Sequence, residues 1–313
     1  MLGKTAGGLF WMFRYLERAE NIARLVETGE RMALTRPDGA DGEWSSILTT
    51  AGTHAAYDAH HDDVSGEAVI DWLLRSSDNP SSVMSCMEAA RMNARTVRTA
   101  LTREVWEAVN ECWMTLRDLL ARKVQTRDLP KALATIRARS AFVRGALHGT
   151  MLRDEMYDFA RLGTFIERAD ATARLLDVKY YVLLPSIAGV GSRLDNVQWE
   201  MILRVVSAEG PFRHVHGNTR GASNIAQFLI LDGRMPRSLA FCYKKIGDNL
   251  DYLYRDHGIR KPCHDLADEI CHRLSEMTIE DIFEEGLHQF LQDFLARNTA
   301  LSHQIEQDFR FYR

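Results

Sequence analysis

The sequence lacks any long apolar run. No stretch approaches the ~18 apolar residues of a membrane span, and the apolar residues 9–13 end at Arg14, too soon for the core of a signal peptide. The 5 cysteines among 313 residues are scattered and form no Cys-x-x-Cys pair, a pattern typical of reduced thiols. We therefore expect a cytoplasmic protein without a membrane anchor.

A basic excess is also missing. Lys and Arg total 39 against 43 Asp and Glu, for a net charge of −4, whereas a dedicated nucleic-acid binder usually carries surplus positive charge. Walker A, Gly-x-Gly-x-x-Gly and Gly-x-Ser-x-Gly motifs are absent too. The sequence therefore predicts no nucleic-acid partner, no nucleotide bound through these devices and no cofactor held by this chain itself.

Alternating strand patterns and hairpin signals between strand-like runs are missing as well. Helical periodicity fills most of the chain, and the 7 prolines fall between the periodic segments. One helix is predicted over residues 9–34 and another over 283–309, with Thr278 and Asp281 as a cap. Three stretches rich in Gly, Asp or Pro predict loops: 35–43, 53–67 and 209–221.

The sequence matches itself at nearly constant offsets. Residues 13–26 (FRYLERAENIARLV) align with 163–176 (GTFIERADATARLL), with six of fourteen positions identical. Segments 44–48 and 72–93 then match 199–203 and 228–249 in the same order, including Pro80/Pro236, Ser82/Ser238 and Cys86/Cys242. This pattern predicts an all-α, internally duplicated helical bundle in one domain, residues 1–313. The two pseudo-symmetric repeats would span about 1–130 and 150–260, followed by C-terminal helices in 263–313.

Each repeat carries a row of charged residues on one helix face. At 100° per residue, Glu17, Glu20 and Arg24 fall within about 60° of one another, and Glu167, Asp170 and Arg174 repeat that row. Arg18 and Arg168 point about 100° away from the neighbouring acids. If the two helices meet, the acids and guanidinium groups share a cleft. Such a cluster can bind an anion, hold Mg²⁺, act in acid/base catalysis, or serve as a structural ion-pair network.

Three segments carry a resemblance to a known family: residues 1–27 (MLGKTAGGLFWMFRYLERAENIARLVE), 162–184 (LGTFIERADATARLLDVKYYVLL) and 228–242 (FLILDGRMPRSLAFC). They resemble the bacterial alpha-E domain family, a helical family of unsettled function named for its Glu-Arg motif. The resemblance covers roughly residues 1–258. Gly7-Gly8, Phe13 and residues 209–217 depart from the family pattern, and a tyrosine-containing segment is replaced at 209–217.

The resemblance implies a system that forms or modifies amide or peptide bonds. Members are encoded beside circularly permuted ATP-grasp proteins and transglutaminase-like proteins, so these are the implied partners, and ATP and Mg²⁺ would come through them. The first hypothesis is an accessory, substrate-handling protein of such a system. The alternative is a stand-alone enzyme, with Glu17 or Glu167 as general base and Arg18 or Arg168 binding an anionic intermediate. In either case Glu20, Arg24, Asp170 and Arg174 are candidate substrate-binding residues.

The remaining motifs carry weaker signals. The loop around 209–221 adds Arg213, His214 and His216 as candidate substrate contacts. Two Glu-x-x-His pairs, Glu269/His272 and Glu285/His288, have the spacing of di-iron helices but lie too close together for two bundle helices. Cys263-His264 and Cys271-His272 do not fit zinc spacing, and residues 60–63 (HHDD) are typical of a solvated loop. We therefore predict no metal site, with a metal-binding helical bundle as the weakest alternative.

Overall fold

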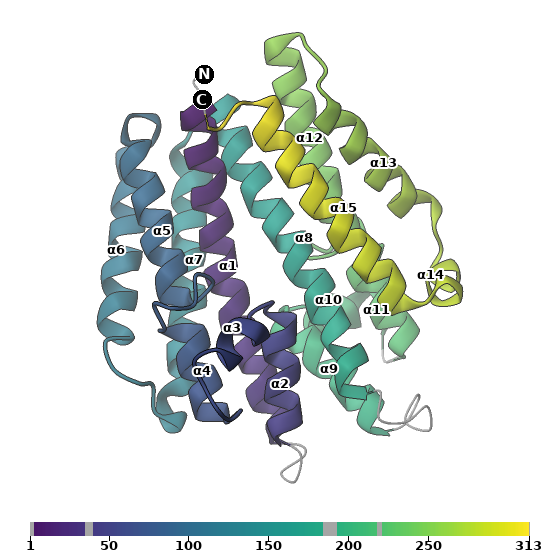
Figure 1. Ribbon diagram of the computed structural model, residues 1–313. Coiled ribbons are helices and arrows are strands. Elements are labelled where there is room, and N and C mark those ends of the chain that lie inside the picture. The colour runs from purple at the N-terminus through teal and green to yellow at the C-terminus, as the bar shows by residue number, and fades with distance from the viewer. Residues whose placement is uncertain (1–2, 35–39, 184–192, 218–220, 313) are drawn as a thin grey trace.

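Two long helices, α1 (Gly3–Ala33) and α8 (Glu155–Leu183), lie side by side at the centre of the computed structural model (Figure 1). The structure describes residues 3–34, 40–183, 193–217 and 221–312. The two helices pack closely because Gly163 faces the backbone of α1: a Cβ at this position would lie 2.1 Å from the Phe10 carbonyl oxygen. Glycine therefore permits the central helix contact on which the charged rows depend.

Other helices surround this central pair. In the first half α2 is Ala40–Thr50, α3 His54–Asp58, α4 Gly66–Leu74, α5 Val83–Thr96, α6 Arg103–Leu119 and α7 Leu129–Thr150. In the second half α9 is Arg193–Val205, α10 Glu209–His216, α11 Ala222–Ile230, α12 Leu239–His257, α13 Pro262–Glu276, α14 Ile279–Glu285 and α15 Leu287–Asp308. Helices α5 and α7 pack on α1, while α12 and α15 pack on α8 (Figure 1).

The all-α prediction is confirmed, since the described residues contain helices and no strand. The duplication itself stays a prediction. Leu9, Phe10, Met12 and Phe13 are buried, so the N-terminal part of α1 is enclosed as its composition predicts. Within the described part of the chain, no helix is both long and apolar enough to cross a membrane.

Several predicted boundaries are wrong. The first helix begins at Gly3 rather than at residue 9. The predicted loop 35–43 gives way to α2 at Ala40, while residues 35–39 lie outside the described residues. The predicted loop 53–67 contains α3 and the start of α4, and 209–221 contains α10. Short polar helices carry too little apolar periodicity to be separated from loops by sequence.

The C-terminal helix prediction fails at one glycine. Thr278 and Asp281 form a capping box, as predicted, but they cap α14, which ends at Glu285. Gly286 then adopts φ 98°, a left-handed conformation that interrupts helical hydrogen bonding, and α15 begins at Leu287. The periodic stripe that predicted one helix over 283–309 therefore spans two.

Candidate functional site at the α1–α8 interface

The two Glu-Arg motifs face each other and pair reciprocally across the central interface. Arg168 on α8 donates to both carboxylate oxygens of Glu17, at 2.9 and 3.0 Å. Arg18 on α1 donates to both oxygens of Glu167, at 2.5 and 3.0 Å. These bidentate contacts match the planar guanidinium to the carboxylate. The two helices therefore bring together all four residues predicted as catalytic.

The cluster around Glu17 is closed by further arginines. Arg144 of α7 lies 3.2 Å from Glu17, and Arg237, just before α12, also lies 3.2 Å from it. Both arginines contact Glu20 as well, and Arg24 pairs with Glu20 at 2.8 Å. Every acid in this half is thus enclosed by guanidinium groups, and Glu17 is 1% exposed.

The charges of these arginines keep the buried acids ionised. Burial by itself raises the pKa of Glu17, but Arg168, Arg144 and Arg237 outweigh it, and the pKa falls well below its usual range. The pKa of Glu167 is lowered in the same way, because Arg18 and Arg14 outweigh its burial. Burial also raises the pKa of Cys86 and Cys242, which lie near the cluster, to about 12. Neither thiol therefore supplies a thiolate nucleophile at neutral pH.

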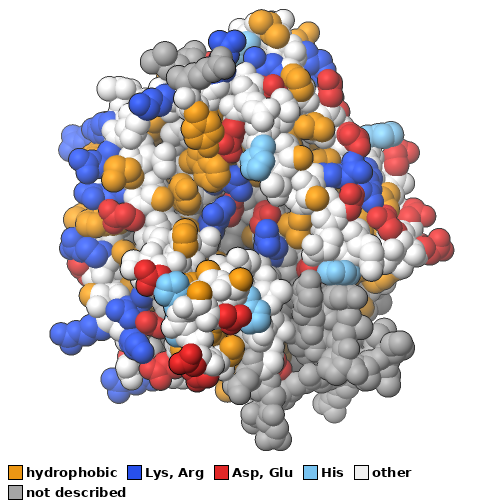
Figure 2. Space-filling view, viewed as in Figure 1, with side chains coloured by type: hydrophobic (Ala, Val, Ile, Leu, Met, Phe, Trp, Pro, Cys, Tyr) orange, Lys and Arg blue, Asp and Glu red, His pale blue; other side chains and the backbone are white. Residues whose placement is uncertain are grey.

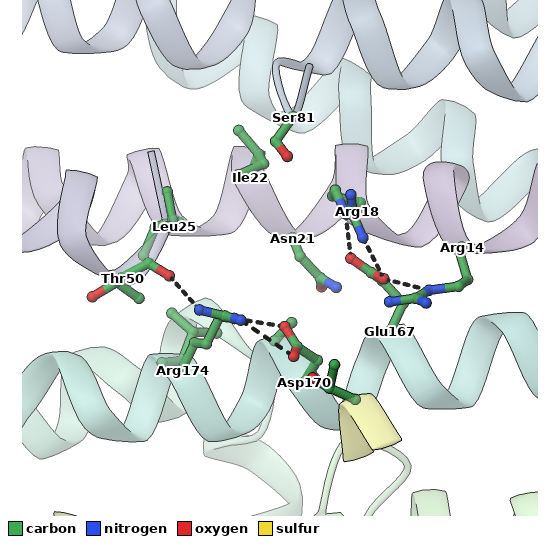
Figure 3. Close-up of a pocket in the computed structure, with 15 residues that line it drawn as sticks. Arg14, Arg18, Asn21, Ile22, Leu25, Thr50, Ser81, Glu167, Asp170 and Arg174 are labelled. Carbon is green, nitrogen blue, oxygen red and sulfur yellow. Dashed lines mark hydrogen bonds and ion pairs between the residues drawn. The ribbon is translucent and has the colours of Figure 1, made fainter. Parts of the chain in front are cut away.

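The cluster around Glu167 opens into a pocket of about 260 Å³. Arg14 adds a 2.9 Å contact to Glu167, and Arg174 pairs with Asp170 at 2.6 Å. Figure 3 shows the two pairs at opposite ends of the pocket, with Asn21 between them and Ser81 beside Ile22. In the space-filling view, basic and acidic side chains gather around a hollow near the middle of this face (Figure 2).

Apolar side chains form the remaining walls of the pocket. Ile22, Leu25 and Leu175 line the pocket, as does the turn at Thr50, Ala51 and Gly52, where Arg174 donates to the Thr50 carbonyl oxygen. Charged groups fixed at both ends of a partly apolar wall can orient a small polar ligand. The described residues around this pocket include no buried histidine or thiolate positioned for covalent chemistry.

The structure divides the predicted substrate-binding residues between different places. Glu20 and Arg24 lie in the closed half, whereas Asp170 and Arg174 line the pocket. Arg213, His214 and His216 lie on α10 and do not line it. There Arg213 pairs with Glu209 at 3.2 Å and His216 stacks on Phe212.

The arginine and amide side chains of the site that were not predicted are Arg14, Asn21, Arg144 and Arg237. Arg237 lies within the matched segment 228–249, opposite Ser81, so a residue-by-residue comparison of the repeats was an available signal. Arg14 lies one turn before Arg18 on the same helix face. No sequence pattern identifies Arg144 as a site residue, because its position depends on how α7 packs against α1.

Residues of the motifs with metal-site spacing make ion pairs and hydrogen bonds with other parts of the protein. Glu269 pairs with Arg297, and Glu285 pairs with Arg273 at 2.8 Å. The ring nitrogens of His264 lie near the Leu250 and Lys261 carbonyl oxygens. Among the residues that the structure describes, no group of three or more His, Cys, Asp or Glu side chains is placed to hold a metal ion.

The two Glu-Arg motifs match the description of a known protein family. A family model named Alpha-E, described as a predicted alpha-helical domain with a conserved ER motif, matches residues 1–309. The chain belongs to the Alpha-E family. In this Alpha-E chain the Glu-Arg motifs are Glu17-Arg18 and Glu167-Arg168, and the ion pairs between them join the two central helices.

Its curated relatives are uncharacterised proteins. One from Mycobacterium bovis is 25% identical over 321 residues, and one from Mycobacterium tuberculosis strain H37Rv is 24% identical over the same length. Each match covers 94% of this chain but 35% of the relative. The chain therefore spans about a third of the length of these relatives. No solved structure matches it.

Proposed function

We propose that this Alpha-E chain is a substrate-handling component of an ATP-grasp-dependent system that forms amide or peptide bonds. Its partner would be a circularly permuted ATP-grasp protein, with a transglutaminase-like protein as a second candidate. ATP and Mg²⁺ would be bound by the partner. The observation that carries the proposal is the pocket between the Arg18–Glu167 and Arg174–Asp170 pairs, which presents fixed charges to a small ligand.

The acidity of the buried carboxyl groups favours handling over catalysis. A general base works best when its pKa lies near the working pH. Glu17 and Glu167 have pKa values far below that, because each is bound by two or three arginines. Both are therefore weak bases at neutral pH, which argues against the stand-alone enzyme hypothesis.

The length of the relatives fits a protein that works with a partner. About two thirds of each curated relative lies outside the match, which leaves room for a further domain on the same chain. A fused domain would raise the effective concentration of a partner activity at this site.

We also infer that the fold arose by internal duplication, because equivalent residues make equivalent contacts. Arg24 donates to the Val205 carbonyl oxygen, and Arg174 donates to that of Thr50 at 3.5 Å. Ser140 of α7 donates to the Leu16 carbonyl oxygen, and Asn298 of α15 donates to that of Ile166. This second correspondence supports extending the repeats through α7 and α15, beyond the boundaries that the sequence matches indicate.

The partnership can be tested by gentle affinity purification of the tagged chain from its native host, with and without ATP, followed by mass spectrometry. An untagged strain is the control. We expect an ATP-grasp protein to co-purify specifically with the tagged chain. Recovery of the chain alone under both conditions would contradict the proposal.

A second assay separates handling from catalysis. The purified chain alone should show no turnover of ATP-independent amide or peptide substrates. Turnover that is lost in Glu167→Gln while the thermal melt shows an intact fold would favour the stand-alone enzyme.

A further inference from the structure

We propose that the two halves of the α1–α8 cluster are functionally unequal: the half around Glu17 is closed by Arg237, and the open half around Glu167 binds the carboxylate of a small molecule or peptide end. This inference rests on the proposed substrate-handling function and names the chemical class of the substrate. Its support comes from the difference between the two halves and from the groups that face the open pocket.

Ser81 and Arg237 occupy equivalent positions. Each precedes the serine that caps the next helix, since Ser82 accepts from the Ser85 amide and Ser238 from the Phe241 amide. The thiols one turn into these helices also match: the Cys86 and Cys242 sulfurs each lie 3.9 Å from the carbonyl oxygen of the preceding proline, Pro80 or Pro236. The local backbone geometry is therefore alike in both halves, while the side chain at this one position differs.

That difference contributes to the opening of one half. Arg237 extends into its cluster and reaches Glu17 at 3.2 Å and Glu20 at 2.5 Å. Ser81 is too short to reach Glu167 or Asp170 and instead lines the pocket. The open half therefore lacks the side chain that Arg237 supplies in the closed half, and a ligand can occupy that space.

The charge of the open half favours an anionic group. Arg14, Arg18 and Arg174 face Glu167 and Asp170, three positive charges against two negative, which leaves a net charge of +1. Glu167 already accepts three hydrogen bonds from Arg14 and Arg18. The guanidinium of Arg174 is bound on one side by Asp170 and its side chain remains 38% exposed.

The side-chain amide of Asn21 is a second, independent indication that the open pocket binds a ligand. The residue is 7% exposed, and its Oδ1 accepts from Arg237 at 3.1 Å in the closed half. This contact fixes the orientation of the amide, so that Nδ2 points away from Arg237. Nδ2 is buried and has no hydrogen-bond partner, and Figure 3 shows the amide between the two charged pairs of the open pocket. A buried donor without a partner is costly, and a bound oxyanion would satisfy it.

The test is isothermal titration calorimetry on the purified chain. The probe is N-acetylglycylglycine, which carries a free carboxylate, and its C-terminal amide is the neutral control. Inorganic phosphate tests another source of oxyanion, and agmatine tests a guanidinium cation that would copy Arg237. We expect the carboxylate to bind and the neutral amide and agmatine not to bind. Binding of phosphate instead of the carboxylate would keep the oxyanion site but overturn the assignment to carboxylates.

Three variants locate the binding. Asn21→Asp keeps the acceptor for Arg237 but replaces the Nδ2 donor with a negatively charged oxygen, so carboxylate affinity should fall at least tenfold. Ser81→Arg should abolish binding by filling the pocket as Arg237 fills its own half. Ser77→Arg, an exposed position in the same loop, adds the same charge outside the pocket and should bind as the wild type does.

The outcomes that overturn the inference are equally specific. Agmatine binding that strengthens in Asn21→Asp would make the pocket a cation site. Carboxylate binding unchanged in Ser81→Arg, or no binding of any probe by the wild type, would exclude this pocket as the site. Thermal melts of both pocket variants verify their fold. Because no partner protein is present, failure here is independent of the co-purification result.

Discussion

At the scale of single residues, the reciprocal Glu-Arg pairs have a structural cost and a structural role. Buried ion pairs often add little net stability, but removing one partner leaves an uncompensated charge. Arg18 is the only arginine that binds both oxygens of Glu167 among the described contacts, while Arg14 binds one. The pairs therefore fix how α1 meets α8 even where they stabilise the fold modestly.

Arg18→Ala should lower the free energy of unfolding by about 2 kcal/mol, because Glu167 keeps only the Arg14 contact in a buried setting. Thermal or urea denaturation measures the loss. Arg103→Ala is the control, since Arg103 pairs with Glu107 on the exposed surface and should change stability little. Equal stability of Arg18→Ala and wild type would show that the Arg18 pair has no structural role.

Asp158 gives a pH-dependent prediction. Burial raises its pKa to about 7, and nearby Asp256 and Asp154 add to the shift. The folded state therefore retains a proton that the unfolded state releases near its ordinary value of 3.8. This contribution to stability is fully present below about pH 4 and is lost as the pH rises to about 7.

Asp158→Asn should remove this loss of stability at high pH, because an amide does not ionise. The melting temperature of this variant should exceed that of wild type by a few degrees at pH 8, with a smaller difference at pH 5. Calorimetric melts at both values test this. Asp62→Asn, at an exposed position, should leave both melts unchanged. A pH-independent effect of Asp158→Asn would indicate that Asp158 is ionised throughout.

At the scale of the elements, the site depends on the close approach of α1 and α8. Gly163→Ala places a methyl group against the Phe10 backbone carbonyl, which cannot move away as a flexible side chain can. We expect the free energy of unfolding to fall by about 1–3 kcal/mol.

Gly145→Ala is the matched control. Gly145 lies on the exposed face of α7, where an added methyl group would meet no atom within 4 Å. Alanine should stabilise this helix by about 0.5–1 kcal/mol. If Gly163→Ala were also stabilising, the central helices would be less closely packed than the structure shows.

The elements also show how far sequence reasoning extends. The long helices α1 and α8 were predictable although α1 is buried on nearly all sides, because no proline interrupts either helix and their charged rows recur at helical spacing. The short helices α3 and α10 were not, because they contribute few buried residues: Tyr57 in α3 and Phe212 in α10. The break at Gly286 was missed because the apolar stripe continues on both sides of it.

At the scale of the whole molecule, the sequence predicted which charged rows would matter but not how they pair. The row geometry of one isolated helix places Glu17 with Glu20 and Arg24. It does not show that Arg168 of the other motif binds Glu17, since that depends on the packing of α8 against α1. The asymmetry between Ser81 and Arg237 is visible in the aligned segments, yet its effect on the pocket required the structure.

The central claim is that each Glu-Arg motif completes the other across the interface. A double-mutant cycle tests it directly, with Arg18→Ala and Glu167→Gln alone and together, and unfolding free energies measured by urea denaturation. A second cycle pairs Arg18→Ala with Glu17→Gln, because these residues are neighbours in sequence but, among the described contacts, do not pair with each other.

We expect a coupling energy above about 1 kcal/mol between Arg18 and Glu167, and one below about 0.5 kcal/mol between Arg18 and Glu17. Strong coupling within the motif together with additivity between Arg18 and Glu167 would contradict the reciprocal arrangement.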